Sequence, residues 1–303
     1  MSNTLQPDPS LIGGVPEAPL AFLPEPVRLF QTRAKRFAFL AESSNLSPYL
    51  KLLAEISSLQ ARLSVMLPAV EPVSESRRKE AAAAVMPPIN RLALADDPQL
   101  IATLTAFCEE AATFEMPEPA RDALVAVQEA NEEERRWLLS NVLSDTIPED
   151  SAAPHLFASA AVQIHMARLA ATLDAESLVR ISTGVCPACG GRPVSSSVMG
   201  AQGIENVRYA SCSCCATQWN EVRIKCLCCG STKGLSYKSV ETHDATVKAE
   251  SSKECNSWVK IFYQVKNASL DPVADDVGSL GLDMLMKDSG LRRYGLNPFI
   301  VGY

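Results

Sequence analysis

Nine of the ten cysteines lie between residues 186 and 255, in a cysteine-bearing unit that occurs twice. The first copy carries two CxxC knuckles, whose cysteines are Cys186, Cys189, Cys212 and Cys215. A shift of forty residues places the corresponding side chains at Cys226, Cys229, Ser252 and Cys255. Four thiolates about 2.3 Å from a central ion are a ligand set that suits zinc and iron alike. The repeat therefore predicts two metal centres, with iron or zinc and up to two ions per chain.

The second centre differs from the first at one corner. Cys226, Cys229 and Cys255 are its predicted ligands, and Ser252 stands where a fourth cysteine is expected. A hydroxyl is a harder and less acidic donor than a thiol, so the affinity for a soft metal should fall. Ser252 or a water molecule would complete the shell, and simple degeneration of one copy is the alternative explanation. His243 lies at the tip of a predicted hairpin, too far away to be a ligand.

The segments between the knuckles predict a hairpin and a third strand in each copy. A turn-rich stretch at 200–203 separates the first two strands, and residues 242–244 separate their counterparts. The predicted strands are 194–199, 207–211 and 218–225 in the first copy, and 235–240, 246–251 and 258–265 in the second. This pattern is typical of a rubredoxin-like or zinc-ribbon module, here present in tandem.

A disulfide framework is the competing interpretation of the cysteines. The chain begins with a polar, proline-containing stretch rather than an apolar signal segment, so we expect it to stay in the cytoplasm, where clustered cysteines are more often metal ligands. Cys214 and Cys228, each the third residue of its knuckle, are not among the predicted metal ligands. They are expected to have no role, with a transient thiol function as the alternative.

The first part of the chain has the spacing of helices rather than strands. Ser47 and Pro48 form an N-cap and N1 pair, and Asp97 and Pro98 open another helix. The predicted helices are 26–42, 47–66, 97–114, 74–85, 119–130, 132–143 and 154–173. Residues 1–24 are predicted to be a loose leader on the surface. The fold class is thus α+β, with a helical bundle at 1–180, a first metal ribbon at 181–224, and a second at 225–303 that includes a C-terminal helix and tail.

The charge balance argues against a nucleic-acid partner. Residues 1–180 carry 15 Lys and Arg against 24 Asp and Glu, a net −9, within a chain of net −7. A general nucleic-acid binder needs a basic surface. No uninterrupted apolar run approaches the roughly 18 residues of a membrane span.

The sequence favours a protein that is not an enzyme. It contains no P-loop, GxGxxG, HExxH or GxSxG motif. His155 and His165 are expected to be packing or surface residues, and the pair Asp275 and Asp276 is expected to be helix-start or surface charge.

The cysteine units, taken with the C-terminal stretch, resemble the FdhE family of formate dehydrogenase accessory proteins. The motifs that carry the resemblance are CPACGGRPVSSS, VRYASCSCC, VRIKC, KAESSKEC, WVKIFYQ, VADD and NPF, within residues 184–300. This resemblance implies a cytoplasmic maturation factor that binds the catalytic subunit of formate dehydrogenase. In such a factor we expect the acidic helical platform to dock the client and two exposed ribbons to present the metal. It also implies that Cys186, Cys189, Cys212, Cys215, Cys226, Cys229 and Cys255 are metal ligands, and that Ser252 is a departure from the family pattern.

Two other functions compete with this one. A rubredoxin-like electron carrier or thiol redox protein would use a reversible iron centre or the spare thiols of Cys214 and Cys228. A zinc-ribbon adaptor for nucleic acid would require salt-sensitive binding, which suits an acidic chain poorly.

Overall fold

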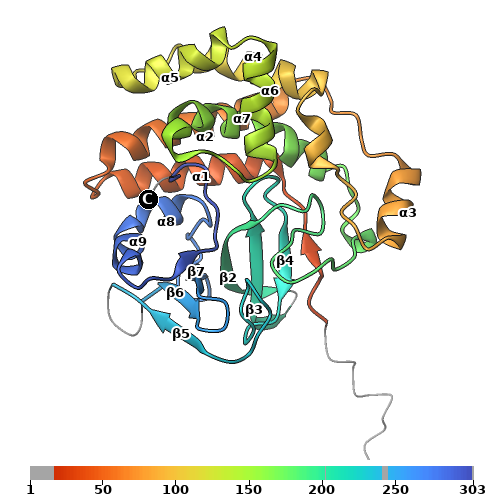
Figure 1. Ribbon diagram of the computed structural model, residues 1–303, viewed down its shortest axis with the longest axis vertical. Helices are drawn as coiled ribbons and strands as arrows, with labels where there is room; N and C mark the ends of the chain where they lie inside the picture. The colour runs from red at the N-terminus through yellow and green to blue at the C-terminus, as the bar shows by residue number, and fades with distance from the viewer. Residues whose placement is uncertain (1–16, 202, 241–244, 302–303) are drawn as a thin grey trace, which may run out of the picture.

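The computed structural model describes residues 17–201, 203–240 and 245–301. A layer of helices lies on one side of the molecule and a twisted sheet on the other, with two short helices beside the sheet (Figure 1). The predicted α+β class is confirmed. The helices of the first layer are α1 (Pro26–Ala41), α2 (Ser47–Met66), α4 (Pro98–Ala111), α5 (Glu118–Glu129), α6 (Glu132–Leu143) and α7 (Ala152–Ala170), while α3 (Glu75–Ala83) lies to one side of them (Figure 1).

Helix α7 forms the centre of the helical layer. Every residue of α7 from His155 to Ala167 is buried, and α1, α2, α4, α5 and α6 all pack against it. Its many alanines, such as Ala158 and Ala161, let neighbouring helices approach closely while still burying apolar surface. A helix that is buried all round is expected for the core of a bundle.

The ribbons form one mixed sheet rather than two separate ones. Its order is β1-β4-β3-β2-β7-β6-β5, and β8 pairs with β7. The strands are β1 (Ala21–Phe22), β2 (Pro193–Ala201), β3 (Ile204–Cys212), β4 (Gln218–Glu221), β5 (Leu235–Lys238), β6 (Val247–Ser252), β7 (Ser257–Tyr263) and β8 (Arg292–Arg293). Each predicted ribbon is present, as β2-β3-β4 and as β5-β6-β7.

Parallel pairing of β2 with β7 joins the two ribbons. Ser196 lies opposite Ile261, and Val198 lies opposite Tyr263. Arg208 strengthens the junction, since its buried guanidinium donates to Ser196 Oγ at 3.0 Å and to Glu250 Oε1 at 3.0 Å. The two metal-ligand sets are therefore carried by one continuous sheet.

The described part of the predicted leader is not loose. β1 pairs with β4 at the sheet edge, and Ala21 is buried. The carbonyl of Pro19 accepts a hydrogen bond from the Tyr209 hydroxyl at 2.9 Å. The expectation of a surface leader is wrong for residues 19–22, because an exposed edge of the first ribbon offers free backbone groups that this segment satisfies. Residues 1–16 lie outside the described part.

The C-terminal segment returns from the sheet to the helices. It contains α8 (Ala274–Gly278) and α9 (Leu280–Lys287). Arg36 of α1 makes a salt bridge with Asp275 of α8, 2.6 Å from Nη2 to Oδ1. The final described residues then run beside α2, where the Tyr49 hydroxyl donates to the carbonyl of Phe299. None of the helices in the described part of the chain is both long and apolar enough to cross a membrane.

Candidate metal centres

The first thiol cluster lies where the first ribbon meets the helical layer. The sulfur atoms of Cys186, Cys189, Cys212 and Cys215 all lie within 4.8 Å of one another. Sγ of Cys186 is 3.6 Å from Sγ of Cys215, and Sγ of Cys189 is 3.5 Å from Sγ of Cys212. A tetrahedron with sulfur about 2.3 Å from its centre has edges of about 3.8 Å. The sulfurs are thus spaced for a central ion, and all ten cysteines of the chain are free thiols.

The first knuckle of each copy is closed by the same backbone turn. The N–H of Gly190 donates to the carbonyl of Cys186 at 2.9 Å, and the N–H of Gly230 donates to the carbonyl of Cys226 at 2.9 Å. Gly190 has φ +74° and Gly230 has φ +73°, a left-handed conformation that other residues adopt at a cost. The glycine after each CxxC therefore lets the chain turn sharply and leaves both thiols on one side.

The helical layer encloses this first cluster. The N–H of Ile89 donates to the carbonyl of Ala188 at 3.1 Å, and the Gln163 side chain donates to the carbonyl of Ser213 at 3.0 Å. All four cysteines are at most 3% exposed. The expectation of an exposed first ribbon is therefore wrong, because its first knuckle contacts the loop that follows α3 and its second contacts α7. A buried set of four protein ligands is typical of structural metal sites.

The electrostatics of the cluster favour a bound cation. A hydrogen bond from Cys186 lowers the pKa of Cys189 to about 6, while burial raises the pKa of Cys186 well above its usual value. The N–H groups of Cys214 and Cys215 also point at Sγ of Cys212, at 3.4 and 3.5 Å. Four adjacent buried thiolates need a dication to offset their charge.

The second cluster is more open. The sulfur atoms of Cys226, Cys229 and Cys255 lie within 4.8 Å of one another, with 3.8 Å between Sγ of Cys226 and Sγ of Cys255. Cys226 is buried, Cys255 is half-buried and Cys229 is exposed. Burial raises the pKa of Cys226 to about 11. Although burial also opposes ionisation of Cys255, hydrogen bonds led by that of Ser252 lower its pKa to about 7.

Ser252 lies at the fourth corner of this second cluster. Its side chain interacts with the thiols of both Cys226 and Cys255. The residue is 1% exposed, and its Oγ has no nitrogen or oxygen partner among the described residues. A buried hydroxyl without such a partner is unusual, and a metal ion beside three sulfurs would supply one. The donor sets thus fit one closed site and one open site, and either could hold iron or zinc.

Comparisons with known proteins account for the whole length of the described chain. The FdhE N-terminal model matches residues 18–183, the FdhE central domain matches 185–223, and the FdhE C-terminal domain matches 224–300. The chain belongs to the FdhE family. The boundaries of these models fall beside the first knuckle of each ribbon, so each thiol cluster lies within one family domain.

Full-length relatives agree with this assignment. An FdhE homolog of Rhizobium meliloti is 56% identical over 99% of both chains. An FdhE homolog of Proteus mirabilis is 33% identical over 93% of this chain and 91% of its own. The crystal structure of the FdhE protein from Pseudomonas aeruginosa superimposes with a TM-score of 0.85, at 30% identity over 94% of this chain and 99% of the other.

The remaining candidate residues lie outside the two clusters. Cys214 is buried beside the first cluster, and Cys228 is half-buried beside the second. His155 is buried in α7, where its ring contacts Asn141 and Ser151. His243 lies outside the described residues.

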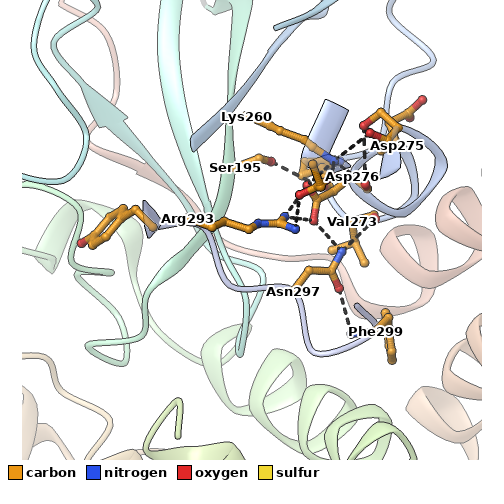
Figure 2. Close-up of polar contacts among 12 residues, drawn as sticks. Ser195, Lys260, Val273, Asp275, Asp276, Arg293, Asn297 and Phe299 are labelled. Carbon is orange, nitrogen blue, oxygen red and sulfur yellow. Dashed lines mark hydrogen bonds and ion pairs between the residues drawn. The ribbon is translucent and has the colours of Figure 1, made fainter. Parts of the chain in front are cut away.

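The FdhE C-terminal domain also contains a buried ion-pair network that the sequence analysis missed. Lys260 Nζ lies 3.2 Å from Asp276 Oδ1 and 2.5 Å from Asp283 Oδ2. Arg293 reaches the same two carboxylates at 2.6 Å each. Figure 2 shows Arg293 and Lys260 meeting at Asp276, with Asn297 donating to its Oδ2 at 2.9 Å. Two cations thus balance two buried anions.

Asp275 and Asp276 do lie in the first turn of α8, as the helix-start expectation has it, but both are buried, so the alternative of a surface charge is wrong. Asp276 is fully buried; burial alone would raise its pKa, but Arg293 and Lys260 lower it. The signal that could have revealed the network is Lys260 itself, since it interrupts the apolar strand β7. A lysine buried in a central strand needs anionic partners.

Removing Lys260 should leave two buried carboxylates with a single cation. We expect Lys260→Met to lower the free energy of unfolding by about 3–5 kcal/mol, because breaking a buried pair strands the remaining charge. Urea titration followed by circular dichroism measures this change. Lys287→Met on the exposed side of α9 is the matched control and should change stability by less than about 0.5 kcal/mol. Equal unfolding midpoints for the two variants would contradict the assignment.

Proposed function

We propose that the chain is an accessory protein for formate dehydrogenase, which binds the catalytic subunit during maturation in the cytoplasm and is not itself an enzyme. The observation that carries this proposal is the match to all three FdhE domains in order, over residues 18–300. The cysteines are grouped at the spacing of metal ligands, and clustered cysteines of this kind are more common in proteins of a reducing compartment.

The two centres are suited to different tasks. The first is buried between helices and ribbon, so an ion held by Cys186, Cys189, Cys212 and Cys215 would fix the helical layer to the sheet. The second has three thiols, a buried hydroxyl that contacts two of them and an exposed Cys229, so an ion there would be open to exchange or to a partner. A thiolate-bound iron would add one-electron chemistry, whereas zinc would not.

The acidic helical layer suits a docking role. Its charge is concentrated in residues 101–150, which include exposed acids of α5 and α6 such as Glu118 and Glu132. Such a surface attracts partners with complementary basic patches and raises their association rate.

Deleting the gene should abolish formate dehydrogenase activity, and a plasmid copy should restore it. The dehydrogenase catalytic subunit should be made in the deletion strain but remain inactive, and it should co-purify with the tagged accessory protein in the complemented strain. Activity in extracts, together with immunoblots of the subunit, distinguishes a maturation defect from lost expression. Normal formate dehydrogenase activity in the deletion strain would rule the proposal out.

A further inference from the structure

An apolar groove lies between the helical layer and the end of the chain. Its cavity volume is about 510 Å³, within the roughly 300–1,000 Å³ typical of binding pockets. The residues that line it are Leu46, Pro48, Tyr49, Leu52, Pro117, Pro119, Ala120, Ala152, Ala153, Leu156, Phe157, Pro298, Phe299 and Val301. None of them is charged, so the groove offers a continuous apolar surface to a ligand.

Contacts from distant parts of the chain hold the groove open. Its C-terminal wall is anchored to α2 by the hydrogen bond from the Tyr49 hydroxyl to the carbonyl of Phe299. Asn297 accepts from the N–H of Phe299 at 3.1 Å and donates to Asp276 at 2.9 Å (Figure 2). The buried ion-pair network thus supports one wall, and helices α2, α5 and α7 form the others. A pre-formed groove loses little conformational entropy when a ligand binds.

Acidic side chains flank the groove. Glu118 stands between the lining residues Pro117 and Pro119, and Glu115 lies two residues before them. Glu149 and Asp150 immediately precede the lining residues of α7.

All four of these carboxylates are exposed, and none forms an ion pair within the described part of the chain. Two cations stand directly beside lining residues in the sequence: Lys51 beside Leu52, and Arg121 beside Ala120. The rim therefore has an excess of negative charge.

We propose that this groove docks an extended segment of the dehydrogenase catalytic subunit that carries apolar side chains between basic residues. The apolar side chains enter the groove, and the basic residues face the carboxylates of α5 and of the segment before α7. This inference rests on the proposed function, since it names the place where the client binds. An apolar centre with a charged rim is the usual composition of a protein interface.

A short synthetic peptide tests the groove without the client. The probe alternates leucine and alanine, has arginine at both ends and carries a fluorophore; a second peptide has glutamate in place of arginine. Fluorescence anisotropy at low salt should show binding of the arginine peptide, at least about tenfold weaker binding of the glutamate peptide, and weakening with added salt. Equal binding of both peptides, or no saturable binding of the arginine peptide, would overturn the proposal.

Two variants fill or charge the groove without touching the metal ligands. Ala153→Trp occupies the space above α7, and Ala120→Lys puts a cation into the apolar lining of α5, where it repels the basic ends of the peptide; each residue is at least partly exposed, so both variants should fold. Each is expected to weaken peptide binding at least about tenfold. Ala83→Trp on the exposed face of α3 is the control and should bind as the unaltered chain does.

Pull-down of the purified catalytic subunit separates this inference from the function on which it rests. Loss of the subunit from both groove variants, but not from Ala83→Trp, would support the groove. If the unaltered chain and both groove variants retain the subunit equally, the groove proposal fails while the accessory function stands. If the unaltered chain does not retain it, the client assignment fails. A dimer in sedimentation that Ala153→Trp disrupts would assign the groove to a second copy of the chain and overturn the proposal.

Discussion

Replacing Cys212 with alanine is expected to empty the first metal centre and to unfold the first ribbon. Three buried thiols would remain, too few to close a tetrahedral site. Structural zinc contributes apparent folding free energies of about 10–16 kcal/mol in small zinc-finger peptides. We therefore expect the variant to lose at least about 4 kcal/mol of stability, which places it among the largest effects of a single substitution.

Metal per chain, measured by mass spectrometry after purification without oxygen, tests this directly. The matched control is Cys214→Ala, which removes a buried thiol from the same knuckle but not from the four-sulfur cluster. The control should keep its metal content and lose only about 1 kcal/mol. Unchanged metal content and melting temperature in Cys212→Ala would contradict a structural ion at this centre. The same measurement identifies the ion as iron or zinc.

The grouping of the cysteines into two clusters could be predicted because the spacing of CxxC knuckles is local in sequence. A CxxCG turn needs only a few residues, and the repeat shows which knuckles pair. The same is true of helix starts: the Asp97 side chain accepts the N–H of Leu100 at 2.9 Å, as an N-cap should. At Ser47 the expectation was one residue off, since the cap position falls on Leu46.

The joining of the two ribbons could not be predicted in this way. Ser195, Ser196 and Ser197 form a polar run that is typical of a loop or sheet edge, yet all three are fully buried in β2. Partners distant in sequence make this possible, such as the guanidinium of Arg208 that donates to Ser196. The alternation of polar and apolar residues along a strand does not specify which other strand lies beside it. The parallel pairing of β2 with β7 therefore depends on tertiary packing, which the local sequence does not reveal.

The difference between the two centres also depends on tertiary structure. The repeat makes them look alike except at Ser252, but only the first packs against the helical layer, through Ile89 and Gln163. The second has its exposed Cys229 instead. Burial of the first centre is set by contacts with residues 50 or more positions earlier in the chain, which no spacing rule within the ribbons contains. This asymmetry is what makes one ion suited to holding the fold and the other to exchange.

Restoring a thiol at Ser252 is expected to convert the open second centre into a tight one. Ser252 is buried beside Cys226 and Cys255, so a cysteine sulfur placed there would face the same point. A thiolate is a softer and more acidic ligand than a hydroxyl. We expect Ser252→Cys to lower the dissociation constant of the second ion at least about 100-fold, or about 2.7 kcal/mol. Competition with a coloured chelator measures that constant.

Ser252→Ala shows what the hydroxyl itself does. If Ser252 Oγ is the fourth ligand, the alanine variant should release the second ion more readily than the unaltered chain. If water completes the shell, the alanine variant and the unaltered chain should have the same dissociation constant for the second ion, while Ser252→Cys should still lower it. Ser251→Cys, whose side chain pairs with Ser236 instead, is the control and should not tighten the site. If Ser252→Cys leaves the affinity for the second ion unchanged, position 252 does not face an ion.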